Sequence, residues 1–153
     1  MRYKPPGWTA LAVTAALAIA ASLSYSLAKP VEVRIDGQPM VTDVPPVRTG
    51  SETVYVPLRA LSDALGAETR YDEKSGEIFL TRGDQLLHLK IGDLHATLNA
   101  MPMTLKDAPF RVRGRAMISL HAVQRAFGVR VKFDKTASRV DVYTLGTDVS
   151  ASP

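Results

Sequence analysis

The sequence contains no cysteine. This absence excludes disulfide bonds, zinc–thiolate sites, a cysteine nucleophile and membrane attachment through a lipidated cysteine. Aromatic residues are also scarce, at 7% of the chain. The fold must therefore be held together mainly by aliphatic packing. The part of the chain after residue 28 has about 125 residues, and a segment of this size can achieve this because it buries roughly two-thirds of its unfolded surface.

Familiar catalytic motifs are missing as well. There is no G-x-S-x-G nucleophile elbow, no H-E-x-x-H zinc motif and no glycine-rich phosphate loop. Carboxylates such as Asp63, Asp72 and Asp134 do not belong to a motif that would force two of them into one cleft. Asp72 and Asp134 instead follow an aromatic residue at a strand end, which favours turn capping. We expect no enzymatic activity and no cofactor.

Charge is absent from one long stretch near the start of the chain. Residues 7–28 are apolar or small, follow Arg2 and Lys4, and end in Ser26-Leu27-Ala28, which resembles a signal-peptidase site. The stretch is also long enough to span a bilayer. Residues 1–28 are therefore predicted to be a signal peptide or an N-terminal membrane anchor, and the diluting serines and threonines favour the signal peptide. The remainder is predicted to be exported to the periplasm, the cell surface or the medium, with a disordered tail at 147–153.

An internal repeat runs through the exported part. With an offset of 62 residues, segments 56–80 and 118–142 share several identical residues. The identical pairs are Leu58 and Leu120, Ala60 and Ala122, Ala64 and Ala126, Gly66 and Gly128, and Asp72 and Asp134. Upstream, with one residue of slippage, IDGQPM at 35–40 aligns with LNAMPM at 98–103. The domain at 29–146 is thus predicted to contain two repeats, at about 31–81 and 94–145, joined by a hairpin near 81–93.

Each repeat has the same pattern of predicted elements. Alternating apolar and polar residues at 31–35 predict a strand, and Asp36-Gly37 predicts a tight hairpin turn. The equivalent Asn99-Ala100 lacks the glycine, so the pattern for a turn is weaker there. A short strand, one amphipathic helix ended by glycine and two further strands follow. The predicted fold class is α+β, with two repeated units, each a small antiparallel sheet with one short helix packed on it.

The motif VPLRALSDALGAETRYD at 56–72, preceded by VRIDGQPM and VPPV, resembles the stalk-domain family. This family is also named after the N-terminal domain of bacterial copper amine oxidases, and the resemblance covers about residues 31–145. It implies an exported, non-catalytic module, common in surface proteins and often found beside wall-acting enzymes. It does not imply copper binding or oxidase activity, which belong to a separate catalytic domain. Two departures stand out: Tyr71 and Phe133 occupy the usual tryptophan position, and residues 118–121 (ISLH) replace VPLR in the second repeat.

The three histidines do not indicate a metal site. His88, His95 and His121 lack the i, i+4 spacing of helical metal ligands. Alternation places His88 on an exposed strand face, where His95 could approach it across the turn at Gly92-Asp93. We interpret this as a chance surface pair and expect no bound metal.

Charges are distributed unevenly between the repeats. Residues 33–80 hold 5 basic and 8 acidic side chains, whereas residues 94–143 hold 9 basic and 3 acidic ones. Arg111, Arg113 and Arg115 alternate along the chain, so an extended strand would point them to one side. Arg130 and Lys132 should face solvent if Val131 and Phe133 pack inward. These five cations form the candidate ligand-binding set, although a merely solvated face is an equally good interpretation.

Three functions remain open at this point. The leading hypothesis is a non-catalytic module at the cell envelope that binds or spaces other components, with its basic face on an anionic envelope polymer, a lipid headgroup or an envelope protein. The second is an accessory part of an envelope hydrolase, or a weak hydrolase, with a site between the repeats. The third is a self-associating structural protein, because the repeats carry opposite charge. Nucleic acid is not an expected partner, since no aromatics are interleaved with the cations.

Overall fold

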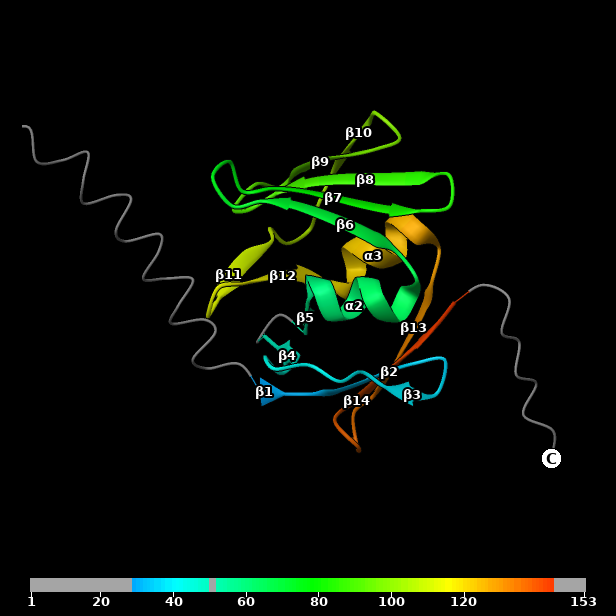
Figure 1. Cartoon of the computed structure of the whole chain (residues 1–153). Coiled ribbons are helices and arrows are strands. Elements are labelled where there is room, and N and C mark those ends of the chain that lie inside the picture. Colours follow the sequence, from blue (N-terminus) through cyan, green and yellow to red (C-terminus); the bar gives the residue numbers. More distant parts are fainter. Residues whose placement is uncertain (1–28, 50–51, 145–153) are drawn as a thin grey trace, which may run out of the picture.

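The structure is a computed structural model, and it describes residues 29–49 and 52–144 (Figure 1). The predicted signal or anchor segment at 1–28 and the predicted tail at 147–153 lie outside these residues. Within the described ranges, neither helix is long and apolar enough to cross a membrane.

Strands dominate the described chain. Before the first helix come β1 (Lys29–Pro30), β2 (Glu32–Ile35), β3 (Gln38–Pro39), β4 (Val47–Arg48) and β5 (Val54–Pro57). Helix α2 (Leu58–Leu65) leads to β6 (Glu68–Asp72), β7 (Glu77–Arg82), β8 (Gln85–Lys90), β9 (His95–Leu98), β10 (Met101–Thr104), β11 (Phe110–Val112) and β12 (Arg115–Ser119). Helix α3 (Leu120–Phe127), β13 (Arg130–Asp134) and β14 (Arg139–Tyr143) complete it. The fold class is α+β, as the sequence predicted.

The strands form three sheets. The first sheet has the order β1-β4-β5-β12-β11, the second β10-β9-β8-β7-β6 and the third β13-β14-β2-β3. All strand pairs in them are antiparallel except β14 and β2, which run parallel. In Figure 1 the two helices lie between the second sheet above and the third sheet below.

The prediction that each unit forms an antiparallel sheet of its own is wrong in detail. The early hairpin β2–β3 joins the late strands β13 and β14, and the later hairpin β9–β10 joins β6 and β7 through β8. Strand β8 lies between β7 and β9 because these two run in the same direction along the sheet. If β7 and β9 were paired directly as parallel strands, the chain between them would need a crossover of about a dozen residues. Strand β8 runs antiparallel to both, so two short turns connect the three strands.

Strands β5 and β12 pair at the centre of the first sheet. Val56 is the register partner of Ile118, and both side chains are completely buried. Their neighbours pair symmetrically, Tyr55 with Ser119 and Pro57 with Met117. The equivalent residues Val56 and Ile118 therefore lie opposite each other, at the centre of a symmetric pairing of the two strands.

Both helices form where the sequence predicted them. In α2, Leu58, Leu61 and Leu65 are buried, and Gly66 ends the helix with a left-handed φ of 63°. In α3, the Ser119 hydroxyl accepts a hydrogen bond from the backbone N–H of Ala122. Pro57 offers no such side-chain cap to α2, since its side chain consists only of carbon and hydrogen.

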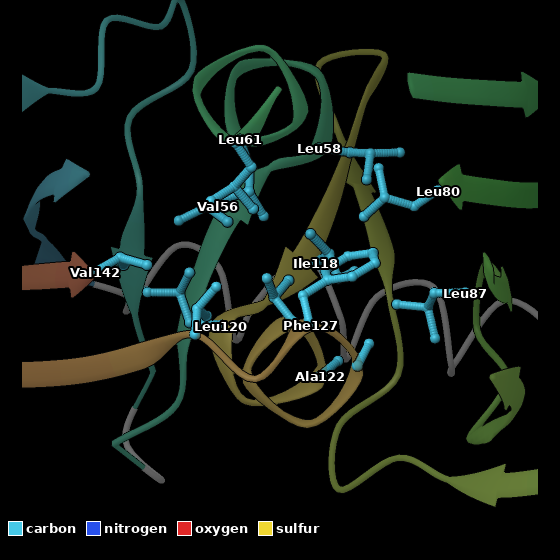
Figure 2. Close-up of a cluster of buried hydrophobic side chains, with 14 of the residues drawn as sticks. Val56, Leu58, Leu61, Leu80, Leu87, Ile118, Leu120, Ala122, Phe127 and Val142 are labelled. Atoms are coloured by element: carbon cyan, nitrogen blue, oxygen red, sulfur yellow. The ribbon is translucent and has the colours of Figure 1, made fainter. Parts of the chain in front are cut away.

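A single apolar core connects the three sheets and both helices. Figure 2 shows buried side chains of this core that come from several elements, including Val56, Leu80, Ile118, Phe127 and Val142. Each fully buried aliphatic side chain of this kind contributes about 1.5–3 kcal/mol. A smaller cluster lies on the other face of the first sheet and contains Val44, Val47, Tyr55, Val112 and Met117.

Both predicted hairpin turns are present. Asp36 and Gly37 have φ values of 49° and 83°, and Asn99 and Ala100 have values of 50° and 66°. Asn99 compensates for the missing glycine through contacts with a neighbouring strand. Its backbone N–H donates to the Leu86 carbonyl at 2.9 Å, and its Oδ1 accepts from the Leu86 N–H at 2.7 Å.

Candidate functional site

A groove of about 700 Å³ opens between helix α2, strand β6, the segment 41–43 and the turn that joins β11 to β12. Its lining combines residues from both predicted units. They are Val41, Thr42, Asp43, Pro57, Leu58, Arg59, Ala60, Asp63, Thr69, Arg70, Tyr71, Glu73, Gly114, Arg115 and Ala116. We call it the α2 groove. It is the place where a site between the predicted repeats would lie.

Helix α2 presents two charged side chains to the α2 groove. Arg59 and Asp63 are exposed, one turn apart, opposite the buried leucine stripe. Among the described residues, neither side chain has a hydrogen-bonding or ionic partner. Although they are four positions apart on one helix, they do not form an ion pair with each other.

The opposite wall is fixed by an ion pair. Arg115 Nη2 and Nε donate to Asp43 Oδ2 at 2.6 and 3.0 Å, which ties segment 41–43 to β12. The hydrogen bonds from Arg115 lower the pKa of Asp43 below its usual value. Asp43 is therefore ionised near neutral pH and cannot act there as a general acid. This counts against hydrolase chemistry led by this carboxyl group.

Tyr71 forms the end of the α2 groove nearest β11. The Arg111 guanidinium lies 5.2 Å from the centre of the Tyr71 ring, and its Nη2 donates to the Glu73 carbonyl at 2.8 Å. The Tyr71 hydroxyl oxygen is buried and has no hydrogen-bond partner in the described part of the chain.

The charges along the α2 groove are balanced. Arg59, Arg70 and Arg115 are matched in number by Asp43, Asp63 and Glu73. Such a lining suits a ligand that carries polar groups of both kinds. It does not create the one-sign field that concentrates a polyanion.

The predicted basic triad is not one face, because a turn interrupts it. Arg113 and Gly114 form the tight turn between β11 and β12, with φ values of 48° and 75°. Arg111 pairs in register with Ala116, whereas Arg115 pairs with Val112. Directly opposed residues share a face and adjacent residues alternate, so Arg111 and Arg115 point to opposite faces of the hairpin. The expectation that an extended strand aligns all three is wrong.

Arg130 and Lys132 lie as predicted on the exposed face of β13, while Val131 and Phe133 pack against the core. They belong to the third sheet, whereas β11 and β12 belong to the first. In Figure 1, β11 and β13 lie on opposite sides of helix α2. The five candidate cations therefore form two separate groups.

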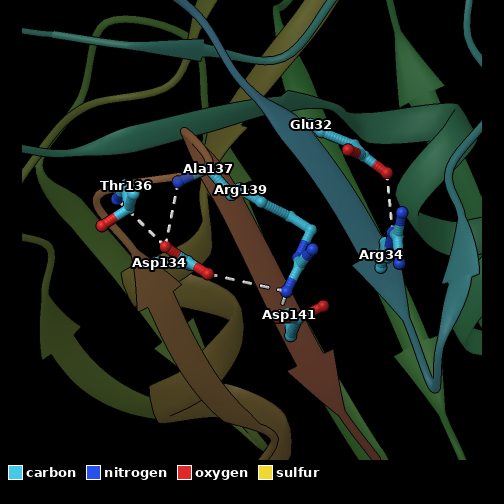
Figure 3. A network of polar contacts seen from close by, with 7 residues as sticks. All are labelled: Glu32, Arg34, Asp134, Thr136, Ala137, Arg139 and Asp141. Atoms are coloured by element: carbon cyan, nitrogen blue, oxygen red, sulfur yellow. Dashed lines mark hydrogen bonds and ion pairs between the residues drawn. The ribbon is translucent and has the colours of Figure 1, made fainter.

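Acidic groups accompany the cations of the third sheet (Figure 3). Arg139 contacts Asp134 at 3.7 Å and Asp141 at 3.2 Å, and Arg34 contacts Glu32 at 2.6 Å. Asp134 also accepts hydrogen bonds from the backbone N–H groups of the following turn, led by Ala137, and these lower its pKa.

Turn capping by the two equivalent aspartates is confirmed. Asp72 accepts from the backbone N–H groups of Lys74 and Ser75, which lowers its pKa as well. The carboxylates of Asp72 and Asp134 thus each hold the turn that follows them, and Figure 3 shows these contacts for Asp134.

The histidines do not converge. His88 stacks on Phe79 with ring centroids 4.4 Å apart, and its Nε2 lies 3.8 Å from Glu77. His95 Nδ1 instead contacts Asp93 at 2.9 Å. Within residues 29–49 and 52–144, no three histidine, aspartate or glutamate side chains are grouped as metal ligands would be.

A second, smaller groove of about 200 Å³ lies beside α3. Its lining repeats part of the α2 groove: His121 and Phe133 stand 62 residues after Arg59 and Tyr71, and Lys106 stands 63 residues after Asp43. We call it the α3 groove.

One hydrogen bond distinguishes the two grooves. Arg125 of α3 donates to the Thr104 carbonyl at 2.7 Å and ties the segment before Lys106 to the helix. In the α2 groove, Asp63 stands in place of Arg125 and Val41 in place of Thr104. A carboxylate cannot donate a hydrogen bond to a carbonyl, so the same tie cannot form there. Val41 is accordingly 90% exposed. The α2 groove, which lacks this tie, is also the larger of the two in volume.

Sequence reasoning missed this contrast and a related pair of contacts. Arg48 lies 4.8 Å from the Phe133 ring centre, just as Arg111 lies over Tyr71. Arg48 and Arg111 align at the 63-residue offset that also aligns IDGQPM with LNAMPM. Extending the alignment of the two repeats through β4 and β11 would have identified Arg48 and Arg111 as equivalent. Comparing the exposed positions of the two helices would have shown that Asp63 on α2 corresponds to Arg125 on α3, with the opposite charge.

One family model, described as the copper amine oxidase N-terminal domain, matches residues 34–142. The matched range contains both grooves and all of the secondary structure from β3 to β13. No curated protein matches the chain.

Proposed function

The chain belongs to the copper amine oxidase N-terminal domain family, and from this premise we propose that it is an exported, non-catalytic stalk-type module. In this proposal it acts at the cell envelope, where it binds or spaces other components. The family supports this reading because its domain is the non-catalytic N-terminal part of the oxidases.

The continuity of the core is the observation that carries the proposal. The main cluster includes Val33 of β2, Leu87 of β8 and Val142 of β14, so it links strands from distant parts of the chain. Because the first and third sheets both combine strands from the two ends of the chain and share the main core with the second, no sheet can move without disrupting the packing of the others. A body of this kind suits a rigid spacer.

The proposal includes the two repeats. The register pairing of Val56 with Ile118 follows the 62-residue offset, the paired contacts of Arg48 and Arg111 follow the 63-residue offset upstream, and the linings of the two grooves combine both. We infer that the domain is a tandem duplicate whose halves exchanged hairpins.

A contact with an anionic envelope polymer has less support, because the five candidate cations are divided between two sheets. If such a contact exists, it uses either the β11–β12 hairpin or β13. Binding of purified protein to anionic wall polymer across a salt series decides this. Neutralising Arg130 and Lys132 together, or Arg113 alone, then identifies the side that binds.

Export is tested in bacteria that produce the full chain with a C-terminal epitope. We expect external protease to remove the epitope, from intact cells or after release of the outer layer. A Leu17→Arg variant should retain the epitope in the cytoplasm, since a charge interrupts the apolar segment. Lys74→Ala, an exposed change far along the chain, is the matched control. The proposed location would be refuted if the epitope on the unsubstituted chain resists protease until the cytoplasmic membrane is lysed.

A further inference from the structure

We propose that the α2 groove binds an extended peptide segment of a partner protein as an added strand beside β6. The peptide would place an acidic side chain near Arg59 and a basic one near Asp63. This inference does not depend on export, because it rests on the groove alone.

Strand β6 offers an unpaired edge. It is the outermost strand of the second sheet, and no described strand pairs with it on the side away from β7. Its residues are mostly exposed. The N–H and C=O groups of such an edge are ready to pair with an added strand, which gives affinity through the backbone of the ligand.

The space beside this edge fits a strand. A volume of about 700 Å³ lies within the range of roughly 300–1,000 Å³ that is usual for ligand sites. Strand β6 has 5 residues, so an added strand of equal length would extend about 17 Å. Walls on both sides, α2 and the Asp43–Arg115 pair, would confine it.

The charges on α2 select the side chains of the peptide. Arg59 and Asp63 are four positions apart, a rise of about 6 Å along a helix. Side chains on one face of an extended peptide are two residues apart, about 7 Å. An acidic and a basic residue at i and i+2 therefore match Arg59 and Asp63, which have no other partners in the described chain.

The α3 groove provides a natural comparison. Strand β13 is likewise the outermost strand of its sheet, but the groove beside it has a volume of only about 200 Å³. Peptide binding is therefore assigned to the α2 groove and not to the α3 groove.

The test uses fluorescence polarisation with the purified exported chain. The probe is a labelled nonapeptide of alternating valine and threonine, with glutamate and lysine two residues apart, made in both orders. We expect one order to bind more tightly than the other. We expect Asp63→Arg to weaken this binding at least tenfold for two reasons. The substitution removes the carboxylate that would pair with the basic residue of the peptide, and the new guanidinium can reach the Val41 carbonyl across the groove. Asp84→Arg, the same charge change at an exposed turn residue that lines neither groove, is the matched control and should leave binding of the probe unchanged.

Backbone pairing is tested with N-methylated probes. Methylating alternate amides on one edge of the peptide should abolish binding, whereas methylating the other edge should have little effect. Melting temperatures close to that of the parent show that both protein variants fold. The proposal is overturned if the probe does not bind at millimolar concentration, if Asp63→Arg binds it normally, or if both methylated probes bind equally. Displacement of the probe by neutral oligosaccharides at micromolar concentration would assign the groove to glycans instead.

Discussion

The two hairpin turns allow the cost of a left-handed side chain to be measured twice in one protein. Gly37 has a φ of 83° in the β2–β3 turn, and Ala100 has a φ of 66° in the β9–β10 turn. Both residues are exposed, and a Cβ added at Gly37 would have no atom within 4 Å. Backbone strain is therefore the main difference that a methyl group makes at either position.

We predict that Gly37→Ala destabilises the protein and that Ala100→Gly stabilises it. A left-handed conformation costs an L-residue roughly 1–2 kcal/mol. The extra freedom of glycine in the unfolded chain offsets about 0.5–1 kcal/mol of this. Each variant should therefore shift the free energy of unfolding by about 0.5–1 kcal/mol, in opposite directions. For a domain of this size the corresponding shift in Tm is about 2–5 °C.

Urea unfolding followed by circular dichroism measures both values against the parent. Ala137→Gly is a suitable control, because Ala137 is exposed in a turn and its φ is not positive. This control should be neutral or destabilising. The reasoning is refuted if Gly37→Ala is as stable as the parent, or if Ala100→Gly is destabilised as much as Ala137→Gly.

Three further predictions follow from the core and from the ionisable groups. Ile118→Ala should cost about 2–5 kcal/mol, and hydrogen exchange should show equal losses at amides in β7 and β14; a loss confined to one of them would contradict a shared core. Burial raises the pKa of Tyr55 to about 12, so the contribution of its neutral phenol to stability is fully present below the unfolded pKa near 10 and is lost as the pH rises towards 12. Tyr55→Phe should remove this loss in unfolding experiments between pH 9 and 12. An equal loss in the variant would show that Tyr55 is not its source. Arg115→Gln should raise the pKa of Asp43 in NMR titrations, because it removes the charged donor; an unchanged value would show that the pair does not persist in solution.

Local elements were predictable because neighbouring residues decide them. The helix beginning at Leu58 and ending at Gly66 follows from apolar spacing and from the left-handed glycine. The Asp36-Gly37 turn and the capping of the turn after Asp72 depend on the same short range. The family resemblance also rested on these positions, and the family match confirms it.

The basic triad shows where a local pattern misleads. Alternation from Arg111 to Arg115 is typical of a strand, but the Arg113-Gly114 pair also favours a tight turn, and the turn is what forms. The two patterns compete within a few residues. Buried Val112 and Met117, which pack in the same small cluster on the two strands of the hairpin, agree with the turn.

The sequence by itself determined the α+β class, the helices, most turns and the 62-residue relation between Leu58 and Leu120. These properties depend on contacts within a few residues, or on identity between two segments. Only the tertiary structure decided that hairpins exchange between sheets, that Val56 meets Ile118 and that the α2 groove is larger than the α3 groove. The tie between α3 and the Thr104 carbonyl needs a donor that reaches some 20 residues back along the chain, which Arg125 supplies and Asp63 cannot. That distance is bridged in space by the packing of all three sheets, which no short stretch of sequence specifies.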